Sequence, residues 1–451
     1  MEHRLGRAVV VGGGIGGLAA AGALAPLFRE VEVFDRDDLP TAARSRIGTP
    51  QDRHSHGLLA GGLQALGEIF PNFQADLIAA GAVSVRVAQD LRLERPDIGV
   101  LPQRDFGRSI LCASRPLIEH VLRRNTEALP NVLLRRGCRV VEIVAAVNGR
   151  AAPAVRFSAD TGSLTTRDAD LVVDASGRGT LTLSLLDALG WDKPPVTEIG
   201  VDIAYATVVV PVPADAPAGW KLGLTFGVPP FDPRHAVLVP IEGQRWTITI
   251  GELHAEDRLQ TWEAFLEQGL GRLHSRTFYN ALRRAEPPGE VRQYSLQASQ
   301  WRHFERLPCL PRGVLPLGDA LCRFNPIYGQ GMSSAAKQAC LLRAVLERLS
   351  TALDPIPAMQ AQVMAGITDI LQTPWVMSTR ADLAFPATRG ERPEDFEEGQ
   401  AFEAALFRAA TVDPVVHRAM VDVMQLLKPM GALREAEIQR RIEAASVRSA
   451  A

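Results

Sequence analysis

An uncharged run from Ala8 to Phe28 constrains this chain more than any other part of its sequence. The run is long enough for a membrane span, and Arg4 and Arg7 precede it as basic residues precede a signal sequence. Six glycines interrupt the run, however, and the β-branched segment "VEVFD" follows it closely. The pattern therefore predicts a strand, a tight glycine turn, an alanine-rich helix and a second strand inside a folded domain.

The segment "AVVVGGGIGGLAAAGAL" has the glycine spacing of a dinucleotide-binding turn. In a G-x-G-x-x-G motif the first glycine permits the turn, the second lets a pyrophosphate approach the backbone, and the third lets the helix pack closely on the strand. The following helix N-terminus offers unpaired N–H groups to the phosphates, and the acidic residue ending the next strand can accept a hydrogen bond from a ribose hydroxyl. These features predict a dinucleotide site without distinguishing FAD from NAD. The expected contacts are Gly12, Gly14, Ile15, Gly16, Gly17, Asp35 and Arg36.

Composition limits the class of protein. The chain has 451 residues, enough for two domains or for one large fold with a second layer. Its formal net charge of -2 argues against a nucleic-acid partner, which usually requires a basic surplus. The five cysteines are scattered without a CxxC pair, so we expect free thiols and a cytoplasmic location. Because glycines break the N-terminal uncharged run, we expect no stable membrane insertion.

The segment "GVLPLGDALCRFNPIYGQGMSSAAKQA" resembles a flavin-binding fingerprint. An apolar strand runs into a Gly-Asp pair, and a helix is expected near Gly331. The resemblance is to the FAD-dependent hydroxylases and epoxidases of the p-hydroxybenzoate hydroxylase superfamily. It implies that Gly318 and Asp319 reach the ribityl chain. It also implies that a proline, two glycines and a methionine lie along the flavin ring, namely Pro326, Gly329, Gly331 and Met332. A helix N-terminus there would stabilise negative charge on the reduced ring.

A middle segment, "DADLVVDASGRGT", resembles the superfamily's second fingerprint. Asp174 and Gly177 match it, but an alanine follows Asp174 where the fingerprint usually has glycine, so a role toward phosphate or toward nicotinamide stays open. Arg115, in "ASRPLIEHVL", matches an arginine that the superfamily places near the flavin chain, although it could also be a solvated helix-cap residue. Three fingerprints in order predict FAD as the cofactor.

Four segments narrow the resemblance: "PQDRHSHGLL", "DLVVDASGRGT", "FNPIYGQGMSSAA" and "TPWVMSTRADLAFP". Together they look like the flavin epoxidases of polyether antibiotic biosynthesis, of the lasalocid and monensin type, as far as about Thr388. The resemblance implies an FAD-dependent monooxygenase that forms a C4a-hydroperoxyflavin. It would epoxidise an alkene of an apolar polyketide- or terpenoid-like substrate in secondary metabolism. Molecular oxygen would be the second substrate, and NAD(P)H or a separate flavin reductase would supply electrons.

His54 and His56 lie two residues apart, as metal ligands on one strand often do. A metal would need further ligands, and the other histidines show no pairing that completes a set. In the resembled family this segment runs beside the flavin. We therefore expect Gln51, Arg53 and one of the histidines at the flavin, and no metal.

The expected fold class is α/β with a Rossmann-like FAD-binding domain of the GR2 type. That domain is expected to be discontinuous, over 1–80, 100–185 and 295–350. An antiparallel substrate-binding sheet is expected over 186–294 with part of 81–99, and a helical region, broken at its prolines, over 351–451. The segment "HAVLVPIEGQRWTITIGE" reads as a hairpin. Its residue Trp246 is a candidate for the roof of a substrate cavity, as are Phe324 and Tyr328 for its walls, and each could instead be a core residue.

Other activities fit parts of the pattern. Aromatic or quinone hydroxylation benefits from a base near the ring hydroxyl, and one of the two histidines could serve. A polyprenyl reductase and a non-catalytic binding protein use the same fold. A flavin halogenase needs a lysine after the first fingerprint, whereas the first lysine here is Lys193, and no WxW segment occurs.

Overall fold

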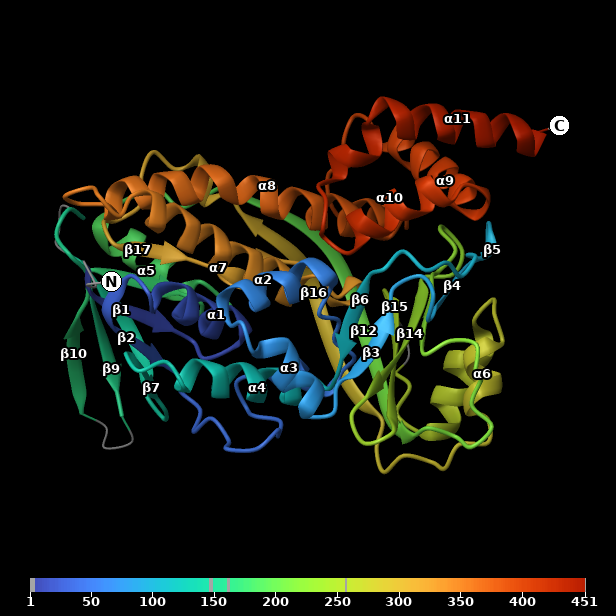
Figure 1. Ribbon diagram of the computed structural model, residues 1–451, viewed down its shortest axis with the longest axis horizontal. Helices are drawn as coiled ribbons and strands as arrows, with labels where there is room; N and C mark the ends of the chain where they lie inside the picture. Colours follow the sequence, from blue (N-terminus) through green and yellow to red (C-terminus); the bar gives the residue numbers. More distant parts are fainter. Residues whose placement is uncertain (1–4, 146–148, 160–162, 256–257, 451) are drawn as a thin grey trace.

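The structure is a computed structural model that describes residues 5–145, 149–159, 163–255 and 258–450. A parallel sheet lies toward one end of the elongated molecule and a larger mixed sheet toward the other (Figure 1). Long helices run over the parallel sheet, and the last helices of the chain cover one edge of the mixed sheet (Figure 1). This α/β architecture confirms the predicted fold class.

The parallel sheet carries the first glycine turn. Its strand order is β17-β11-β1-β2-β7, so it joins segments from three distant parts of the sequence. The strands are β1 (Leu5–Val11), β2 (Phe28–Phe34), β7 (Val132–Arg135), β11 (Leu171–Asp174) and β17 (Val314–Pro316). Apolar side chains point to both faces, as expected for a sheet that is covered on both sides.

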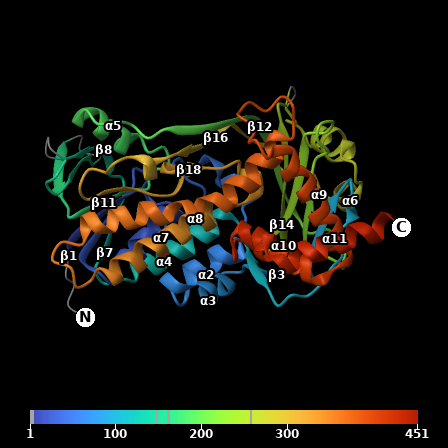
Figure 2. The same cartoon turned by 90° about the horizontal axis from the view of Figure 1, so that it is seen from above.

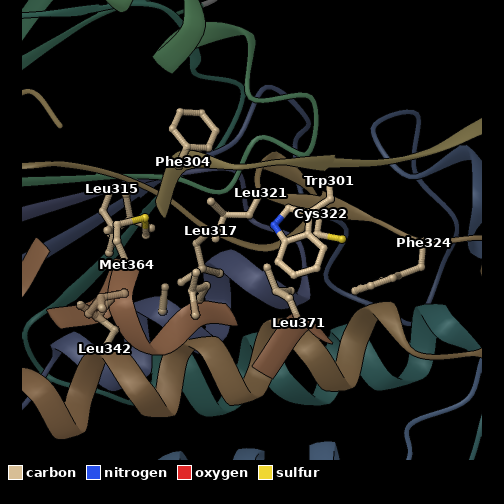
Figure 3. Close-up of a cluster of buried hydrophobic side chains, with 14 of the residues drawn as sticks. Trp301, Phe304, Leu315, Leu317, Leu321, Cys322, Phe324, Leu342, Met364 and Leu371 are labelled. Carbon is tan, nitrogen blue, oxygen red and sulfur yellow. The ribbon is translucent and has the colours of Figure 1, made fainter. Parts of the chain in front are cut away.

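Helices cover one face of the parallel sheet, and a small antiparallel sheet with one helix covers the other. The helices of the first group are α1 (Ile15–Leu24), α2 (Ala60–Ile69), α3 (Phe73–Ala79), α4 (Arg115–Glu127), α7 (Gly331–Arg348) and α8 (Ile356–Leu383). The second group comprises β8 (Arg139–Val144), β9 (Ala154–Ser158), β10 (Leu164–Asp168) and α5 (Thr180–Leu189). Figure 3 shows part of the core between β17 and the helices α7 and α8.

The mixed sheet has eight strands in the order β18-β16-β12-β15-β14-β13-β4-β5. They are β4 (Leu91–Arg95), β5 (Gly99–Val100), β12 (Val196–Pro211), β13 (Leu222–Thr225), β14 (Arg234–Ile241), β15 (Arg245–Leu253), β16 (Arg292–Arg302) and β18 (Cys322–Arg323). The antiparallel pairing of β14 with β15 confirms the predicted hairpin. The long strands β12 and β16 extend from the parallel-sheet end into this sheet (Figure 2).

The predicted domain limits remain a prediction, but sheet membership differs from them at one place. Residues 295–350 were assigned to the FAD-binding domain, whereas β16 and β18 pair within the mixed sheet. Two further strands, β3 (Val83–Arg86) and β6 (Ser109–Cys112), pair with each other, and α6 (Thr277–Leu282) packs against the mixed sheet.

The chain ends in helices, as predicted: α8 is followed by α9 (Phe396–Val412), α10 (Pro414–Met424) and α11 (Ala436–Ala450). The expectation that Pro374 breaks a helix is wrong, because this residue lies inside α8. A proline removes one backbone hydrogen bond, and burial of Leu371 and Trp375 on either side of it compensates by packing. None of the described helices combines the length and apolar character that crossing a membrane requires.

Candidate flavin site

The three predicted fingerprints meet in space although they are far apart in sequence. A Cβ atom built on Gly12 would lie 2.6 Å from the carbonyl oxygen of Ala175, and one on Gly16 would lie 3.4 Å from the Cβ of Ala335. One built on Gly179 would lie 3.0 Å from the carbonyl oxygen of Ala320. Each fingerprint therefore contacts the other two, at the ends of β1, β11 and β17.

The glycines of the first turn play the three roles that the motif predicts. Gly12 has a φ of 102°, which favours glycine at the turn. A Cβ on Gly17 would lie 1.8 Å from the carbonyl oxygen of Gly12, so only glycine lets α1 pack this closely on β1. Beside Gly14 the nearest such neighbour is Arg46, at 3.9 Å. The backbone of Gly14 is thus open to a ligand at the start of α1, where no side chain caps the helix.

Asp35 follows β2, as predicted, but its carboxylate already has several partners. It accepts hydrogen bonds from the backbone N–H of Gly13 at 2.7 Å and of Asp37 at 2.8 Å. Arg46 lies 3.3 Å from it and also contacts Asp37 and Glu119, at 2.8 and 2.7 Å. Burial raises the pKa of Asp35, and Arg46 opposes this shift. Asp35 therefore fixes the glycine turn, and its contact with a ribose remains a prediction.

Asp174 does not present a free carboxylate, in contrast to its assignment as a cofactor contact. Its Oδ1 accepts hydrogen bonds from the backbone and hydroxyl of Ser176, at 3.1 and 2.6 Å. Its Oδ2 accepts from the backbone and hydroxyl of Thr182, at 3.1 and 2.8 Å. These four bonds use the acceptor capacity of the carboxylate. Asp174 shapes the loop before α5, and only Gly177, with a φ of 84° and no neighbour within 4 Å of a built Cβ, is open.

Asp319 is accessible at the centre of the site. It lies in the 3-10 turn Gly318–Ala320 after β17, and a Cβ on Gly331 would be 3.9 Å from its Oδ1. The start of α7 beside it has no side-chain cap, so its first N–H groups face the site. Its side chain is exposed to the site, but the protein atoms packed around the site partly desolvate it and raise the pKa of Asp319, and Arg323, Arg115 and Arg302 oppose this shift.

Arg115 is a buried cation and not a solvated helix-cap residue. It begins α4 and is 6% exposed, and its Nη1 lies 3.3 Å from Glu119. Burial lowers its pKa, and Glu119 opposes this effect. Within the described chain, the Nη1 group has no hydrogen-bond acceptor of suitable geometry. A buried donor of this kind fits a phosphate or another oxygen-rich ligand.

His54 lies against the mixed sheet, in a segment whose Gly57 approaches the loop 324–330 before α7, which we call the flavin-side loop. Its Nδ1 lies 2.7 Å from the hydroxyl of Thr207 on β12, and its ring is 5.5 Å from that of Tyr294 on β16. Burial, together with Arg292 and Arg53, lowers the pKa of His54 to about 4, so the imidazole is neutral near pH 7. The segment is held in place by the Ser55 backbone, which donates to the hydroxyl of Thr249 at 3.1 Å.

His56 points differently from His54, and the pair does not form a shared ligand set. Its Nδ1–H donates to the backbone carbonyl of His54 at 2.9 Å. Burial and Arg115 lower the pKa of His56 to about 3. Among the described residues, no group of three or more His, Cys, Asp or Glu side chains is placed to hold a metal ion. A Cβ on Gly57 would lie 3.7 Å from the carbonyl oxygen of Gly329, so the segment does reach the flavin-side loop.

Two of the aromatic candidates are core residues. Trp246 lies on the face of the mixed sheet that packs against α6 and stacks with Trp220 at 6.2 Å. The opposite face, which carries Thr207 and Thr249, meets the histidine segment. The assignment of Trp246 to the cavity roof was therefore wrong, because successive residues of a strand point to opposite faces. Phe324 is 5% exposed and belongs to the buried cluster drawn in Figure 3, which agrees with the alternative of a core residue.

Tyr328 belongs to a buried polar network that the sequence did not reveal. Its hydroxyl donates to Oδ1 of Asp382 on α8 at 2.9 Å, and Asn325 donates to the same oxygen at 3.0 Å. Asn325 in turn accepts from the hydroxyl of Tyr205 on β12 at 2.7 Å. This network ties the 3-10 turn Pro326–Tyr328 to both α8 and the mixed sheet. The only sequence signal was an Asp among apolar residues of a helix, which needs the fold to be interpreted.

The remaining predicted contacts differ in exposure. Arg36 is on the surface, with its side chain 53% exposed, and only approaches Asp37 at 4.0 Å. Gln51 and Arg53 lie in the 3-10 turn before His54, where Gln51 is half-buried and Arg53 is exposed. Gly318 and Gly329 both have positive φ, and Pro326 is exposed at the turn. Met332 packs its side chain on the core between α1 and α2.

These observations fit FAD on several counts. The open backbone at Gly14, the uncapped starts of α1 and α7, the accessible carboxylate of Asp319 and the spare donor of Arg115 lie within one set of contacting segments. An elongated ligand with a pyrophosphate, a polyol and a polar ring edge has a complementary set of groups.

Several solved structures with a similar fold are flavin-dependent proteins. The chain is similar to a flavoprotein/dehydrogenase from Cytophaga hutchinsonii, with a TM-score of 0.68, 14% identity and 98% of each chain covered. It is similar to p-nitrophenol 4-monooxygenase PnpA from Pseudomonas putida DLL-E4, with a TM-score of 0.61, 18% identity and coverage of 93% and 97%. It is also similar to the flavin-dependent halogenase CmlS, with a TM-score of 0.64, 15% identity and coverage of 93% and 76%. The fold is that of the flavin-dependent monooxygenases and halogenases.

A sequence relative places the chain more closely. It is 30% identical over 441 residues to Protein Rv3254 from Mycobacterium tuberculosis, covering 91% of this chain and 87% of that protein. The chain therefore belongs to the same family as Protein Rv3254. No protein-family model matches the chain. The neighbours agree with the predictions of an FAD-dependent enzyme of the monooxygenase class, whereas the narrower resemblance to polyether epoxidases is not established by them.

Proposed function

We propose that this protein is an FAD-dependent monooxygenase that epoxidises an alkene of an apolar polyketide- or terpenoid-like substrate. The observation that carries the FAD part is the meeting of the three fingerprints around the accessible carboxylate of Asp319. The epoxidation part is supported by the four segments that look like polyether epoxidases. We further propose that NAD(P)H or a separate flavin reductase supplies the electrons.

The residues of the site have distinct proposed roles. Bound FAD would supply the redox chemistry that activates oxygen, which no side chain provides. The glycine turn and Arg115 hold phosphate, Asp319 orients the ribityl chain, and the start of α7 favours negative charge on the flavin ring. The segment around His54 and the face of the mixed sheet that meets it exclude water from the reacting oxygen.

Aromatic or quinone hydroxylation is the second candidate, and the state of His54 favours it. Nδ1 of this neutral imidazole is engaged by Thr207, and no hydrogen bond to another described residue occupies Nε2. A neutral imidazole can take a proton from a phenol. Halogenation has less support, because no lysine occurs before Lys193.

The first test is cofactor content followed by product analysis. The purified protein should contain FAD, and Asp319→Ala should lower its occupancy, while Asp97→Ala on the surface should not. Reduced holoenzyme with labelled dioxygen and candidate polyenes should give products that gain one labelled oxygen atom. A fully flavinated Asp319→Ala variant would refute the role of Asp319. Full activity that depends on chloride or bromide, with halogenated products, would refute the proposed monooxygenase.

A further inference from the structure

Tyr328 meets the polar side chains of Asp382 and His235, neither of which is among the expected flavin contacts. Its hydroxyl donates to Asp382, and its ring meets that of His235 on β14 edge-on, with 6.4 Å between centroids. Gln330 lies two residues further along the same loop and contacts the sulfur of Met377 on α8 at 3.9 Å. We refer to Tyr328, Asp382, His235 and Gln330 as the Tyr328 cluster.

Three atoms of the Tyr328 cluster are buried without a hydrogen-bond partner in the described part of the chain. They are Oδ2 of Asp382, Oε1 of Gln330 and Nε2 of His235, and the three residues are 0%, 2% and 6% exposed. A buried polar group without a partner destabilises the fold, because it has lost its hydrogen bonds to water. One of these atoms belongs to the hydrogen-bond partner of Tyr328, one to a ring that meets it, and one to a residue two positions further along its loop. Unpaired atoms so placed indicate a place where a polar ligand group is bound, because folded proteins otherwise pair nearly all buried polar groups.

The hydrogen-bonding character of these atoms defines the group that fits. The backbone N–H of Gly227 donates to Nδ1 of His235 at 3.4 Å, and burial lowers the pKa of His235 to about 4. The imidazole is therefore neutral, with its proton on Nε2, and offers one donor. Gln330 offers an acceptor, and Oδ2 of Asp382 accepts when the carboxyl is ionised and donates when it is protonated. A hydroxyl both donates and accepts, so it is the smallest neutral group that matches.

The charges around the cluster exclude an anionic ligand group. Among the described residues no lysine or arginine acts on the carboxyl of Asp382, and its neighbours Tyr328 and Asn325 are uncharged. A carboxylate or phosphate placed here would meet a carboxyl group and no compensating cation. The rings of Phe226 and Phe385 lie 6.0 and 6.2 Å from that of His235 and provide an apolar surface for a hydrocarbon attached to the hydroxyl.

We propose that the Tyr328 cluster is a subsite that binds a hydroxyl group of the substrate. The substrate class is then a hydroxylated hydrocarbon, an alcohol or a phenol, and neither a carboxylic acid nor an unsubstituted alkene. That the bound molecule is the substrate rests on the proposed function, whereas binding of a hydroxyl group at this subsite can be measured without turnover. His235 and Gln330 determine specificity in this proposal.

The test uses the FAD-loaded protein and two pairs of probes. The pairs are farnesol with its methyl ether and 1-naphthol with its methyl ether, titrated by calorimetry. At least one free hydroxyl compound should bind about tenfold more tightly than its ether, as one hydrogen bond of about 1.4 kcal/mol provides. A preference limited to farnesol indicates a polyene alcohol, and one limited to 1-naphthol indicates a phenol. Equal affinity within both pairs, or no binding of any probe, would overturn the proposal.

Two substitutions at His235 form a matched pair. In His235→Asn the side-chain oxygen can replace Nδ1 as the acceptor for Gly227, but the Nε2 donor is lost, so the preference for the hydroxyl should disappear. In His235→Gln the amide nitrogen can replace the Nε2 donor, so the preference should persist. A preference that survives in His235→Asn would show that the ether is rejected by its size, and would overturn the assignment. If the protein preferred the hydroxyl compound to its ether but never retained FAD, the proposed function would be contradicted and the hydroxyl subsite would be supported.

Discussion

Asp382→Asn tests the raised pKa of Asp382, whose carboxyl holds the 3-10 turn Pro326–Tyr328. Burial raises the pKa of Asp382 from 3.8 to about 7, despite hydrogen bonds from Tyr328 and Asn325 that favour the charged form. The folded protein therefore binds one more proton than the unfolded chain between these two pH values. Stability conferred by the neutral carboxyl is lost as pH rises through this window, since ionising a buried group is unfavourable.

The expected size follows from the same shift. One pKa unit corresponds to about 1.4 kcal/mol, so the penalty that develops between pH 5 and pH 8 is about 3 kcal/mol. Asparagine keeps an oxygen that can accept from Tyr328 and Asn325, and it does not titrate. The difference in stability between variant and wild type should move by this amount in favour of the variant between pH 5 and pH 8. For a chain of this length the corresponding change in Tm is about 3 °C.

The assay is thermal unfolding of both FAD-loaded proteins at a series of pH values from 5 to 8. Comparing the variant with the wild type at each pH cancels the contributions of the histidines, which titrate equally in both. Asp369→Asn, at an exposed position of the same helix α8, serves as a control that should show no such trend. A difference in Tm that stays constant from pH 5 to pH 8 would refute the argument, because Asp382 would then have the same ionisation in both states.

Three further predictions address the site. Gly17→Ala should destabilise the apoprotein by roughly 3 kcal/mol through its clash with the Gly12 carbonyl, whereas Gly14→Ala should leave apoprotein unfolding unchanged and weaken FAD binding; similar unfolding of both variants would contradict the assigned roles. Trp246→Ala should lose about 3–5 kcal/mol of stability, measured by denaturant unfolding, while folded material keeps its FAD absorbance; selective loss of turnover would restore it to the active site. If His54 is a base, turnover should fall as the pH drops toward about 4 and stay level from pH 6 to pH 8. His54→Ala should lower turnover without changing the metal content. A pH profile with its midpoint near 6.5 would contradict the lowered pKa of His54.

The sequence predicted the parts of the site that depend on backbone geometry. The roles of Gly12, Gly14 and Gly17 follow from steric limits that act within a few residues, and the structure has all three. The meeting of the fingerprints is also predictable, because parallel strands bring their carboxyl ends to one edge of a sheet. Local patterns of this kind carry their own geometry, so they transfer directly to the fold.

The sequence failed where a side chain's direction depends on distant strands. Alternation in β15 places Trp246 on one face and Thr249 on the other, but nothing local shows which face meets the histidine segment. The aromatic side chain was assigned to the cavity, and the structure instead puts threonine hydroxyls there. The prediction that Asp174 contacts the cofactor failed for a similar reason. Its four hydrogen bonds come from Ser176 and Thr182, which reach it only in the folded loop before α5.

The position of Asp382 depends on helix α8 continuing past Pro374. Had Pro374 ended the helix, as its residue type suggests, Asp382 would not continue the same rod toward the flavin-side turn. Packing of Leu371 and Trp375 into the core keeps the helix intact across the proline, and the last turns then carry Asp382 to Tyr328 and Asn325. A buried carboxyl destabilises the fold near neutral pH, so its position needs a compensating gain. Asp382 holds the turn Pro326–Tyr328 through Oδ1 and keeps Oδ2 for a ligand, so the compensating gain is in binding and not in stability.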